Sequence, residues 1–396
     1  MGRQVKVLVL GAGLTGLTAA WRLKSRGLDD LLILERHERP GGLLKTNRSE
    51  GVEIDHLPHV FFTKDEQAAA VFRDVIGDYH SCRHNLGVMW KGRYVEFPFQ
   101  NHVNQLDIED RRRVLRGLLQ VKASRRAPPR NLEEYAVQVL GDGIVDLFFR
   151  PYNEKLWQTP LARMDHRWVA SKIRLPDTED LADSILGTPP PERGDVSPHA
   201  EFFYPRRGGI ESLIEGLAGR VGAGSIRCRT EALEIDPARR VVRAGGESIR
   251  YEKLISTLPL AQTVRLAGLR QGRSAAARLR ANRVVCLQYV LKEVNLPDYH
   301  WIYVPDPGLP FYRLTRIDLI NPAAAPGRKV LLVECALPGD RACADVAGLA
   351  AETTRRLEAL GVIPGGAVER RWEFDYAPAY AVPHLTHGRD TAFLLC

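Results

Sequence analysis

Long hydrophobic runs and paired cysteine motifs are both missing from this sequence. No apolar stretch reaches the roughly 20 residues that a membrane-spanning helix needs. The N-terminal run VLVLGAGLTGL is interrupted by glycines and lacks a signal-peptide cleavage site. The six cysteines are scattered, without CxxC or metal-like spacing. We therefore expect a cytoplasmic protein with reduced thiols, no membrane span and no metal site.

The basic stretches lack interleaved aromatic residues. Arginine supplies most of the formal net charge of +8, and the runs DRRRVLRG and VKASRRAPPR concentrate part of it. Such runs are typical of solvated helix faces. A binding site for anionic ligands is the more specific alternative. A nucleic-acid partner is not expected, because aromatic residues do not alternate with the charges.

Internal repeats are also absent, and the length of 396 residues is too great for one hydrophobic core. The content of 44% hydrophobic and 26% charged residues is typical of a globular chain. These values predict two domains, or one large domain with insertions.

The clearest motif opens the chain, in VKVLVLGAGLTGLTAAWRLKSRG. A short apolar strand pattern leads into Gly11, Gly13 and Gly16, which fit G-x-G-x-x-G, and a helix pattern follows. A second strand pattern ends at Glu35, about 20 residues further on, as the dinucleotide fingerprint requires. We expect the glycines to admit a pyrophosphate at the helix N-terminus and Glu35 to accept from a ribose hydroxyl. This unit alone leaves FAD and NAD open.

A glycine pair, Gly41 and Gly42, follows Glu35 in ERHERPGGLLKT. A second close backbone approach suits an extended flavin dinucleotide and favours FAD. This continuation resembles the large flavoprotein family that includes amine oxidases, protoporphyrinogen oxidase and UDP-galactopyranose mutase. The predicted cofactor-binding residues are Gly11, Gly13, Leu14, Thr15, Gly16, Glu35, Arg36, Gly41, Gly42, Leu43 and His59.

Four further segments occur in the order typical of one branch of that family. They are EFPFQNHV (96–103), PYNEKLW (151–157), FFYPRRGGIESLIEGLA (202–218) and PGLPFYRLT (307–315). Together they resemble UDP-galactopyranose mutase, especially its eukaryotic-type branch. The resemblance implies FAD in its reduced form, whose N5 attacks the anomeric carbon of a nucleotide-diphosphate sugar, with NAD(P)H or another reductant as a possible partner.

The expected fold class is α/β: a Rossmann-like FAD-binding domain with an inserted helical lobe and a mixed β-sheet substrate domain. We place the FAD-binding part with its flavin loop at 1–104 and the helical lobe at 105–195. A β-meander that returns to the FAD domain follows at 196–262, and the substrate-binding sheet at 263–396. The Pro- and Asp-rich stretch 176–199 is expected to be a loop. The family's terminal FAD-binding helix is expected to be absent, because the chain stops at HGRDTAFLLC.

Three residues carry the predicted catalysis by resemblance. Arg313, in FYR, would clamp the diphosphate, because a guanidinium matches phosphate oxygens bidentately. Lys172 stands where the mutases have a second arginine. The lysine ammonium gives a point charge in place of the planar fork of a guanidinium. His59 matches a histidine close to the flavin N5, but Leu57 and Pro58 replace the two glycines before it, so the loop is expected to be stiffer.

The remaining predicted residues would line a nucleotide-sugar pocket. Asn153 and Trp157 are four apart, so on a helix they share one face. A capping asparagine and a core tryptophan are the alternative interpretation. The full predicted set is Gln100, Asn101, Tyr152, Asn153, Trp157, Lys172, Arg174, His199, Tyr312, Arg313 and Tyr380.

Departures from the family leave the sugar, the nucleotide and the reductant open. His199 replaces a substrate-contacting asparagine, and His84 and Leu86 replace an arginine and a serine of the NADPH site. Two other functions stay as alternatives. One is an oxidoreductase of the amine or protoporphyrinogen oxidase class, and the other is a non-catalytic relative.

Overall fold

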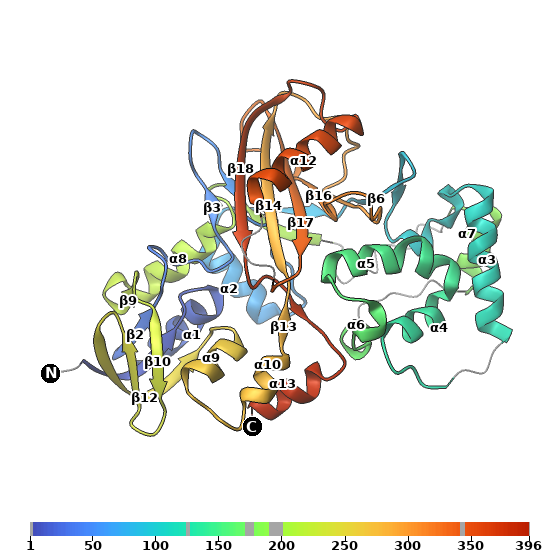
Figure 1. Cartoon of the computed structure of the whole chain (residues 1–396). Coiled ribbons are helices and arrows are strands. Elements are labelled where there is room, and N and C mark those ends of the chain that lie inside the picture. Colours follow the sequence, from blue (N-terminus) through green and yellow to red (C-terminus); the bar gives the residue numbers. More distant parts are fainter. Residues whose placement is uncertain (1–2, 124–126, 171–177, 190–200, 341–344, 396) are drawn as a thin grey trace. The chain divides into compact units, whose positions relative to one another are not determined.

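The computed structural model describes residues 3–123, 127–170, 178–189, 201–340 and 345–395. The chain divides into two compact units, each assembled from separate stretches of sequence (Figure 1). Unit 1 contains Met1–Cys82, Glu201–Leu279 and Arg389–Cys396, and unit 2 contains Arg83–Ala200 and Arg280–Gly388. Each unit contains one large sheet.

Unit 1 is built on a six-stranded sheet in the order β10-β11-β12-β1-β2-β9. Strand β1 pairs in parallel with β12 and β2, and β10, β11 and β12 form an antiparallel meander. The sheet strands are β1 (Gln4–Leu10), β2 (Leu31–Leu34), β9 (Ile226–Arg227), β10 (Ala232–Asp236), β11 (Val241–Ala244) and β12 (Glu247–Ser256). Two small pairs, β3 (Thr46–Asn47) with β4 (Ile54–Asp55) and β5 (Tyr79–Arg83) with β8 (Glu201–Pro205), complete its strands.

Alternation along β1 explains why both faces of this sheet are covered. Val7 and Val9 belong to a core with helices α1 and α8, whereas Leu8 and Leu10 belong to a core with the meander. The helices of unit 1 are α1 (Leu14–Lys24), α2 (Glu66–Ile76), α8 (Glu211–Val221), α9 (Leu260–Leu266), α10 (Arg273–Arg278) and the 3₁₀ turn Ala223–Ser225. Most of the last helix, α13 (His387–Leu395), also belongs to unit 1. The sequence patterns had not predicted α13.

Unit 2 is built on a seven-stranded mixed sheet in the order β18-β14-β17-β16-β15-β6-β7. Only the pair β15–β6 is parallel among these strands. The strands are β6 (Leu86–Trp90), β7 (Arg93–Glu96), β14 (Arg283–Leu291), β15 (Trp301–Tyr303), β16 (Arg313–Arg316), β17 (Lys329–Leu337) and β18 (Val368–Tyr376). A small pair joins β13 (Arg280–Ala281) to β19 (Ala381–Val382), and α11 (Ile317–Ile320) follows β16.

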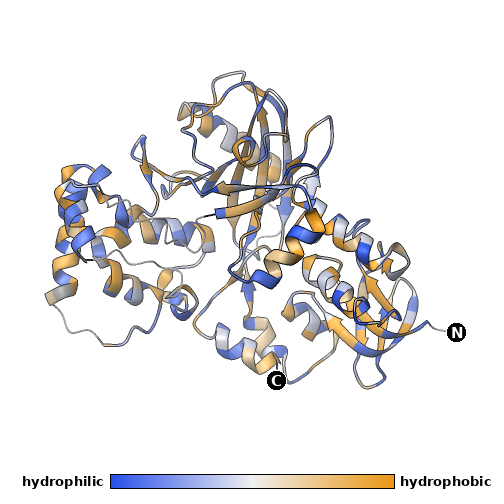
Figure 2. Cartoon of the chain, turned by 180° about the vertical axis from the view of Figure 1, so that it is seen from behind, coloured by the Kyte–Doolittle hydropathy of each residue, from blue (hydrophilic) through white to orange (hydrophobic). Residues whose placement is uncertain are grey.

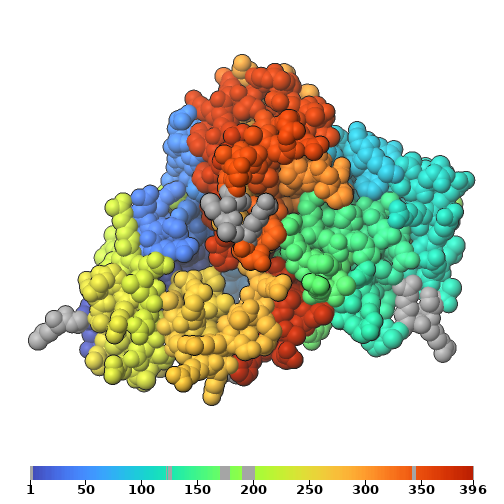
Figure 3. Space-filling model, in the orientation of Figure 1, coloured from blue at the N-terminus to red at the C-terminus, as the bar shows by residue number. Residues whose placement is uncertain are grey.

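Helix α12 (Val346–Ala359) covers one face of this sheet, and Figure 3 shows its outer surface in orange-red. Its Ala350 and Leu357 pack with odd-numbered residues of β17 such as Leu331 and Val333. The even-numbered Glu334 of β17 therefore points to the opposite face, because side chains alternate along a strand.

The helical lobe of unit 2 shares a hydrophobic core with one side of the mixed sheet, which contributes Val88, Val95 and Ala336. Its elements are α3 (Ile108–Ala123), α4 (Leu132–Ile144), a π-helical turn (Val145–Phe149), α5 (Arg150–Trp157), α6 (Arg167–Ala170), α7 (Thr178–Leu186) and the 3₁₀ turns Phe99–Asn101, Val103–Gln105 and Leu161–Arg163. Figure 2 shows hydrophobic and hydrophilic residues on the same helices of this lobe. None of the helices in the described part of the chain is long and apolar enough to cross a membrane.

Helix α7 corrects the prediction of a loop across 176–199. Leu181 and Ile185 are one turn apart and both buried, and Glu179 and Asp180 lie in the first turn, where acidic residues stabilise a helix. The prolines that suggested a loop lie outside this helix. The Rossmann-like unit, the helical lobe and the mixed sheet otherwise confirm the predicted fold class.

Candidate functional site

The glycine-rich turn of unit 1 has the geometry of a dinucleotide cradle. Gly11 adopts φ +98°, and a Cβ on Gly16 would lie 2.0 Å from the carbonyl oxygen of Gly11. Leu14 and Thr15 form the start of α1, for which Gly13 is the N-cap. The turn thus brings the N-terminus of α1 to the end of β1, where backbone N–H groups and the helix dipole favour a phosphate.

The second glycine pair contacts the first directly. Gly13 and Gly41 form an isolated parallel bridge, and the Gly41 N–H donates to the Ala12 carbonyl at 3.0 Å. A Cβ on Gly42 would lie 3.2 Å from the Cα of Gly13. Side chains on Gly13 or Gly42 would fill this contact, so the backbones of the two turns can approach a ligand together.

Glu35 lies beside the same turn and is 6% exposed. Its carboxylate accepts from the Ala12 N–H at 2.9 Å and from the His37 N–H at 3.0 Å. Burial and the cations around Lys45, with Arg39 foremost among these neighbours, lower the Lys45 pKa. These residues fit a flavin dinucleotide: glycines for the pyrophosphate, an oriented carboxylate for a ribose, and basic side chains nearby. Arg36 follows Glu35, and the predicted Leu43 is partly exposed.

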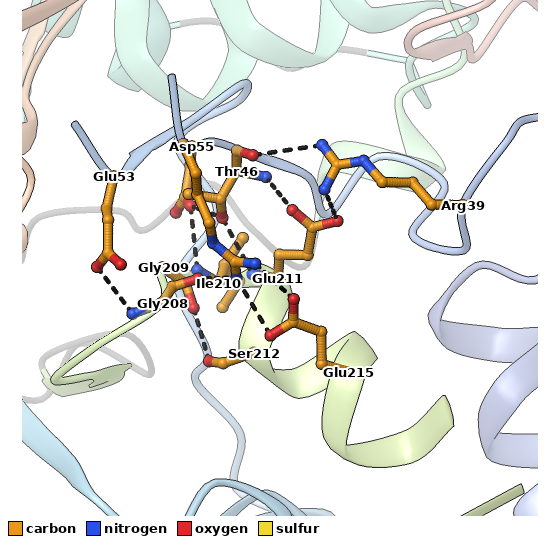
Figure 4. Close-up of polar contacts among 11 residues, drawn as sticks. Arg39, Thr46, Glu53, Asp55, Gly208, Gly209, Ile210, Glu211, Ser212 and Glu215 are labelled. Atoms are coloured by element: carbon orange, nitrogen blue, oxygen red, sulfur yellow. Dashed lines mark hydrogen bonds and ion pairs between the residues drawn. The ribbon is translucent and has the colours of Figure 1, made fainter. Parts of the chain in front are cut away.

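A buried network around Asp55 joins the β3–β4 pair to β8 and to the residue before α8 (Figure 4). The Asp55 carboxylate accepts from Thr46 Oγ1 at 2.7 Å and from Tyr204 Oη at 2.6 Å. It also accepts from the Ile210 N–H at 3.0 Å. Burial raises the Asp55 pKa to about 7, although these hydrogen bonds act in the opposite direction.

Glu211 extends this network toward the glycine pair. Its carboxylate forms an ion pair with Arg39 and accepts from the Thr46 N–H at 2.8 Å. Arg39 and Thr46 flank Gly41 and Gly42 in the sequence, whereas Asp55 lies four residues before His59. The network therefore fixes both ends of the segment that the sequence assigns to the flavin.

His59 lies in the loop after β4, where its N–H donates to the Leu57 carbonyl at 2.8 Å. Pro58 precedes it, and the stiffness expected of this loop stays a prediction. The neighbouring His56 has its pKa lowered to about 3 by burial, with Arg39 and Lys45 adding to the effect. The catalytic role of His59 stays a prediction.

In unit 2, Arg313 and Glu334 form a cross-strand pair on β16 and β17. Arg313 Nη2 donates to Glu334 Oε1 at 2.7 Å, and Arg313 Nε contacts Oε2. Tyr312 Oη donates to Glu334 Oε1 at 2.7 Å. The Arg313 side chain is 19% exposed and that of Glu334 is 0% exposed. Among the described residues, Arg313 Nη1 has no hydrogen-bond partner, so it remains available to a ligand.

Aromatic rings surround this pair. Tyr152 lies edge-on to Tyr303 and to Tyr312, with centroids 5.3 and 6.4 Å apart. Burial, followed by the charge of Glu334, raises the Tyr312 pKa, and burial likewise raises the Tyr380 pKa. These phenols therefore stay neutral. The O–H of Tyr312 donates to Glu334, which leaves Tyr380 as the phenol that can donate to a ligand anion.

Asn153 and Trp157 share helix α5, as predicted. Asn153 Nδ2 donates to the Phe149 carbonyl at 2.7 Å, so its amide N–H stabilises the start of the helix. Trp157 is 5% exposed and lies edge-on to Tyr380, with centroids 6.0 Å apart. The structure thus brings Trp157, Tyr380, Tyr152 and the Arg313 pair into one part of unit 2, and their ligand contacts stay predictions.

Gln100 and Asn101 form a 3₁₀ turn after Pro98. The Asn101 Oδ1 atom is buried and has no hydrogen-bond partner in the described ranges. His84 lies beside Trp301, with ring centroids 5.1 Å apart, and Leu86 begins β6. The predicted Lys172, Arg174 and His199 lie outside the described residues.

The sequence interpretation did not identify Glu334, Tyr303 or Lys155. Glu334 left a signal, because it is a single carboxylate inside the apolar run KVLLVECAL. A buried carboxylate requires a cationic or hydrogen-bonding partner, so this position should have directed attention to Arg313. Tyr303 left no comparable signal.

Known proteins that resemble this chain do so across both units. The chain resembles the crystal structure of a reduced UDP-galactopyranose mutase, with 26% identity, a TM-score of 0.91, and coverage of 98% of this chain and 86% of that one. It also resembles a protein from Exiguobacterium sp. described as a protoporphyrinogen oxidase, with 19% identity, a TM-score of 0.76, and coverage of 100% and 90%. The second likeness shows the fold alone.

Among curated proteins, a Baeyer-Villiger monooxygenase of Pseudomonas aeruginosa is 39% identical over 59 residues. That match covers 15% of this chain and only 11% of the monooxygenase. It supports a local likeness without extending to the whole protein.

The sequence profile of the flavin containing amine oxidoreductases matches residues 14–391. This match spans both units and confirms the predicted flavin cofactor, FAD. The chain belongs to the flavin containing amine oxidoreductase family.

Proposed function

We propose that this protein is a flavin-dependent nucleotide-sugar mutase that interconverts the pyranose and furanose forms of a sugar. The cluster of Arg313, Glu334 and Tyr312 carries the proposal. A fixed guanidinium with neutral phenols around it suits the diphosphate of a nucleotide sugar. The extensive likeness to a UDP-galactopyranose mutase supports the same interpretation.

In the proposed site, Glu334 orients Arg313 through two of its nitrogens and leaves Nη1 for a phosphate oxygen. The buried carboxylate offsets part of the arginine charge before the ligand binds. When the diphosphate leaves the anomeric carbon, Arg313 would stabilise the charge that develops on it. Tyr380 would donate a hydrogen bond to the same group, while the Tyr312 O–H donates to Glu334 and helps to orient it.

The rings of unit 2 would then serve the sugar and the nucleotide. Trp157 offers a flat apolar wall, and its burial excludes water from one side. Gln100, Asn101 and Asn153 would supply acceptors and donors to hydroxyl groups, as would Tyr152. Lys172, Arg174 and His199 are included in the proposal from the sequence alone.

In unit 1, the cofactor would be held by the two glycine turns and Glu35. Reduced FAD, when bound, would supply a nucleophile at N5. His59 would face the flavin, and Asp55 and Glu211 would keep its loop in place. NAD(P)H is one possible source of the electrons.

An oxidoreductase of the amine or protoporphyrinogen oxidase class is the second candidate, and membership of the amine oxidoreductase family favours it. In that case oxidised flavin would accept a hydride from the substrate. The buried arginine–glutamate pair argues for an anionic ligand instead of an amine. A non-catalytic relative is the third candidate.

Turnover under reducing conditions distinguishes these candidates. The purified protein would be scanned for flavin absorbance and incubated with UDP-, GDP- or TDP-sugars, with and without dithionite. A ring isomer formed only after reduction supports the mutase. Hydrogen peroxide released from an amine without added reductant supports the oxidase, and a protein that does not retain added FAD excludes both.

A further inference from the structure

The ammonium group of Lys155 is surrounded by backbone carbonyl oxygens in unit 2. Lys155 Nζ donates to the carbonyls of Val304 at 3.0 Å and Phe311 at 2.9 Å, and it also contacts the Asp306 carbonyl. An ammonium has three N–H donors, so these three acceptors engage all of them. Among the described residues, no carboxylate forms an ion pair with Lys155.

The segment that Lys155 contacts is poor in hydrogen-bond donors of its own. Residues 304–311 read VPDPGLPF, and the three prolines in this stretch have no N–H. Within the loop, the Leu309 N–H donates to the Asp306 carbonyl at 3.3 Å, and the Gly308 N–H donates to the Asp306 side chain at 2.8 Å. Carbonyls buried without a donor would be costly, so an external donor stabilises this conformation.

Two of the three contacted carbonyls, those of Val304 and Phe311, lie at the two ends of the loop, and that of Asp306 lies within it. Val304 follows β15, and Phe311 directly precedes Tyr312 and Arg313. The Val304 N–H donates to the Tyr312 carbonyl at 2.8 Å, which closes the loop at its base. Because Lys155 belongs to helix α5, one side chain connects that helix to both ends of the loop before the arginine.

We infer that Lys155 is a positioning residue for the anion-binding cluster. Its ammonium acts as a built-in cation that holds the loop 304–311 closed. By doing so it sets where β16 begins, and hence where Tyr312 and Arg313 meet Glu334. This inference rests on the proposed function for its ligand, a nucleoside diphosphate, but the holding of the loop is independent of that function.

Two variants of Lys155 test the inference, with Lys292→Met on the exposed surface of the same unit as control. Lys155→Met retains the apolar part of the side chain and removes its three N–H donors. Lys155→Gln retains two N–H donors without the charge. Hydrogen exchange would be followed in peptides covering 304–313. We expect exchange about tenfold faster in Lys155→Met, a smaller increase in Lys155→Gln, and no change in Lys292→Met.

The second measurement is the affinity for UDP, with and without Arg313→Ala. We expect Lys155→Met to weaken UDP binding by about fivefold when Arg313 is present and to have no further effect when Arg313 is absent. If Lys155→Met does not fold, the same comparison is made with Lys155→Gln.

Three results would overturn the inference: unchanged exchange in 304–313, exchange that increases equally throughout unit 2, or equal loss of UDP affinity in both backgrounds. If UDP does not bind the unmodified flavoprotein, the proposed function fails. The exchange measurement then still decides whether Lys155 holds the loop.

Discussion

The two units prepare their predicted ligand contacts in opposite ways. Unit 1 relies on the backbone: Gly11, Gly13 and Gly16 bring main-chain atoms together, and a buried network holds the neighbouring loops. Unit 2 relies on side chains, with Arg313 and Glu334 paired across two strands. A backbone site depends on the absence of side chains, and a side-chain site depends on the identity of each one. The two kinds of site should therefore respond differently to substitution.

Arg313→Ala should have the largest effect on turnover, and it should also lower the free energy of unfolding, because it leaves the buried Glu334 carboxylate without its cation. Loss of one preorganised donor to a developing anion costs about a hundred- to a thousandfold in kcat. Flavin content should stay unchanged, because Arg313 belongs to unit 2. Mutase assays and the flavin absorbance of the purified variant check both points.

Arg313→Lys is the matched variant, since it keeps the charge and loses the planar fork. It should recover only part of the activity. A loss of flavin in Arg313→Ala would contradict the division between the two sites.

The same contrast explains what the sequence could predict. The glycine fingerprint follows from a spacing within one continuous stretch, so Gly11, Gly16 and Glu35 could be assigned at once. The Arg313–Glu334 pair joins residues 21 positions apart on separate strands, and only their pairing register brings them together. Family resemblance suggested Arg313, but it did not reveal the carboxylate that orients it.

Lys155 shows a second limit of sequence interpretation. Its partners are carbonyl oxygens, which every residue carries, so no side-chain pattern marks them. Helix α7 shows a third, because nearby prolines outweighed the short apolar spacing of Leu181 and Ile185. In each case tertiary contacts decided the outcome.

Gly16→Ala should have the next largest effect, and it should remove flavin. The new Cβ would lie 2.0 Å from the Gly11 carbonyl, so the turn or helix α1 must move. We expect FAD affinity to fall by at least about a hundredfold, measured as flavin retained after gel filtration, because a displaced turn no longer presents its N–H groups to the pyrophosphate.

Gly219→Ala is the control for this change. Gly219 lies on α8, and a Cβ there would meet nothing within 4 Å. It should retain flavin and gain up to about 1 kcal/mol of stability, because alanine favours a helix. Equal flavin retention in the two variants would show that the close packing of the turn is not required.

Asp55→Asn should change how the stability of the protein depends on pH. The Asp55 pKa is raised from 3.8 to about 7 in the folded chain, chiefly by burial. Between these values the folded state binds more protons than the unfolded state, so the Asp55 contribution to stability falls as pH rises. Over the whole interval the loss is at most about 4 kcal/mol.

An asparagine does not titrate, so the variant should lack this contribution. Urea unfolding at about pH 5 and about pH 8 would give the free energy of unfolding of both proteins. The advantage of the unmodified protein over Asp55→Asn should shrink at the higher pH. A constant difference would mean that Asp55 does not titrate in this range, and that the hydrogen bonds from Thr46, Tyr204 and Ile210 outweigh its burial.

Asn153→Ala should have the smallest effect and tests whether a side chain can serve both the fold and the ligand. Asn153 Nδ2 already donates to the Phe149 carbonyl, which leaves Oδ1 as the atom that can accept from a sugar hydroxyl. Loss of one such hydrogen bond costs about 1 kcal/mol, so KM should rise roughly fivefold while kcat stays the same. If only the free energy of unfolding changes and KM does not, Asn153 belongs to helix α5 alone. Of the two residues, Trp157 would then remain as the predicted ligand contact. Fewer side chains of unit 2 would contact the ligand than the sequence predicts.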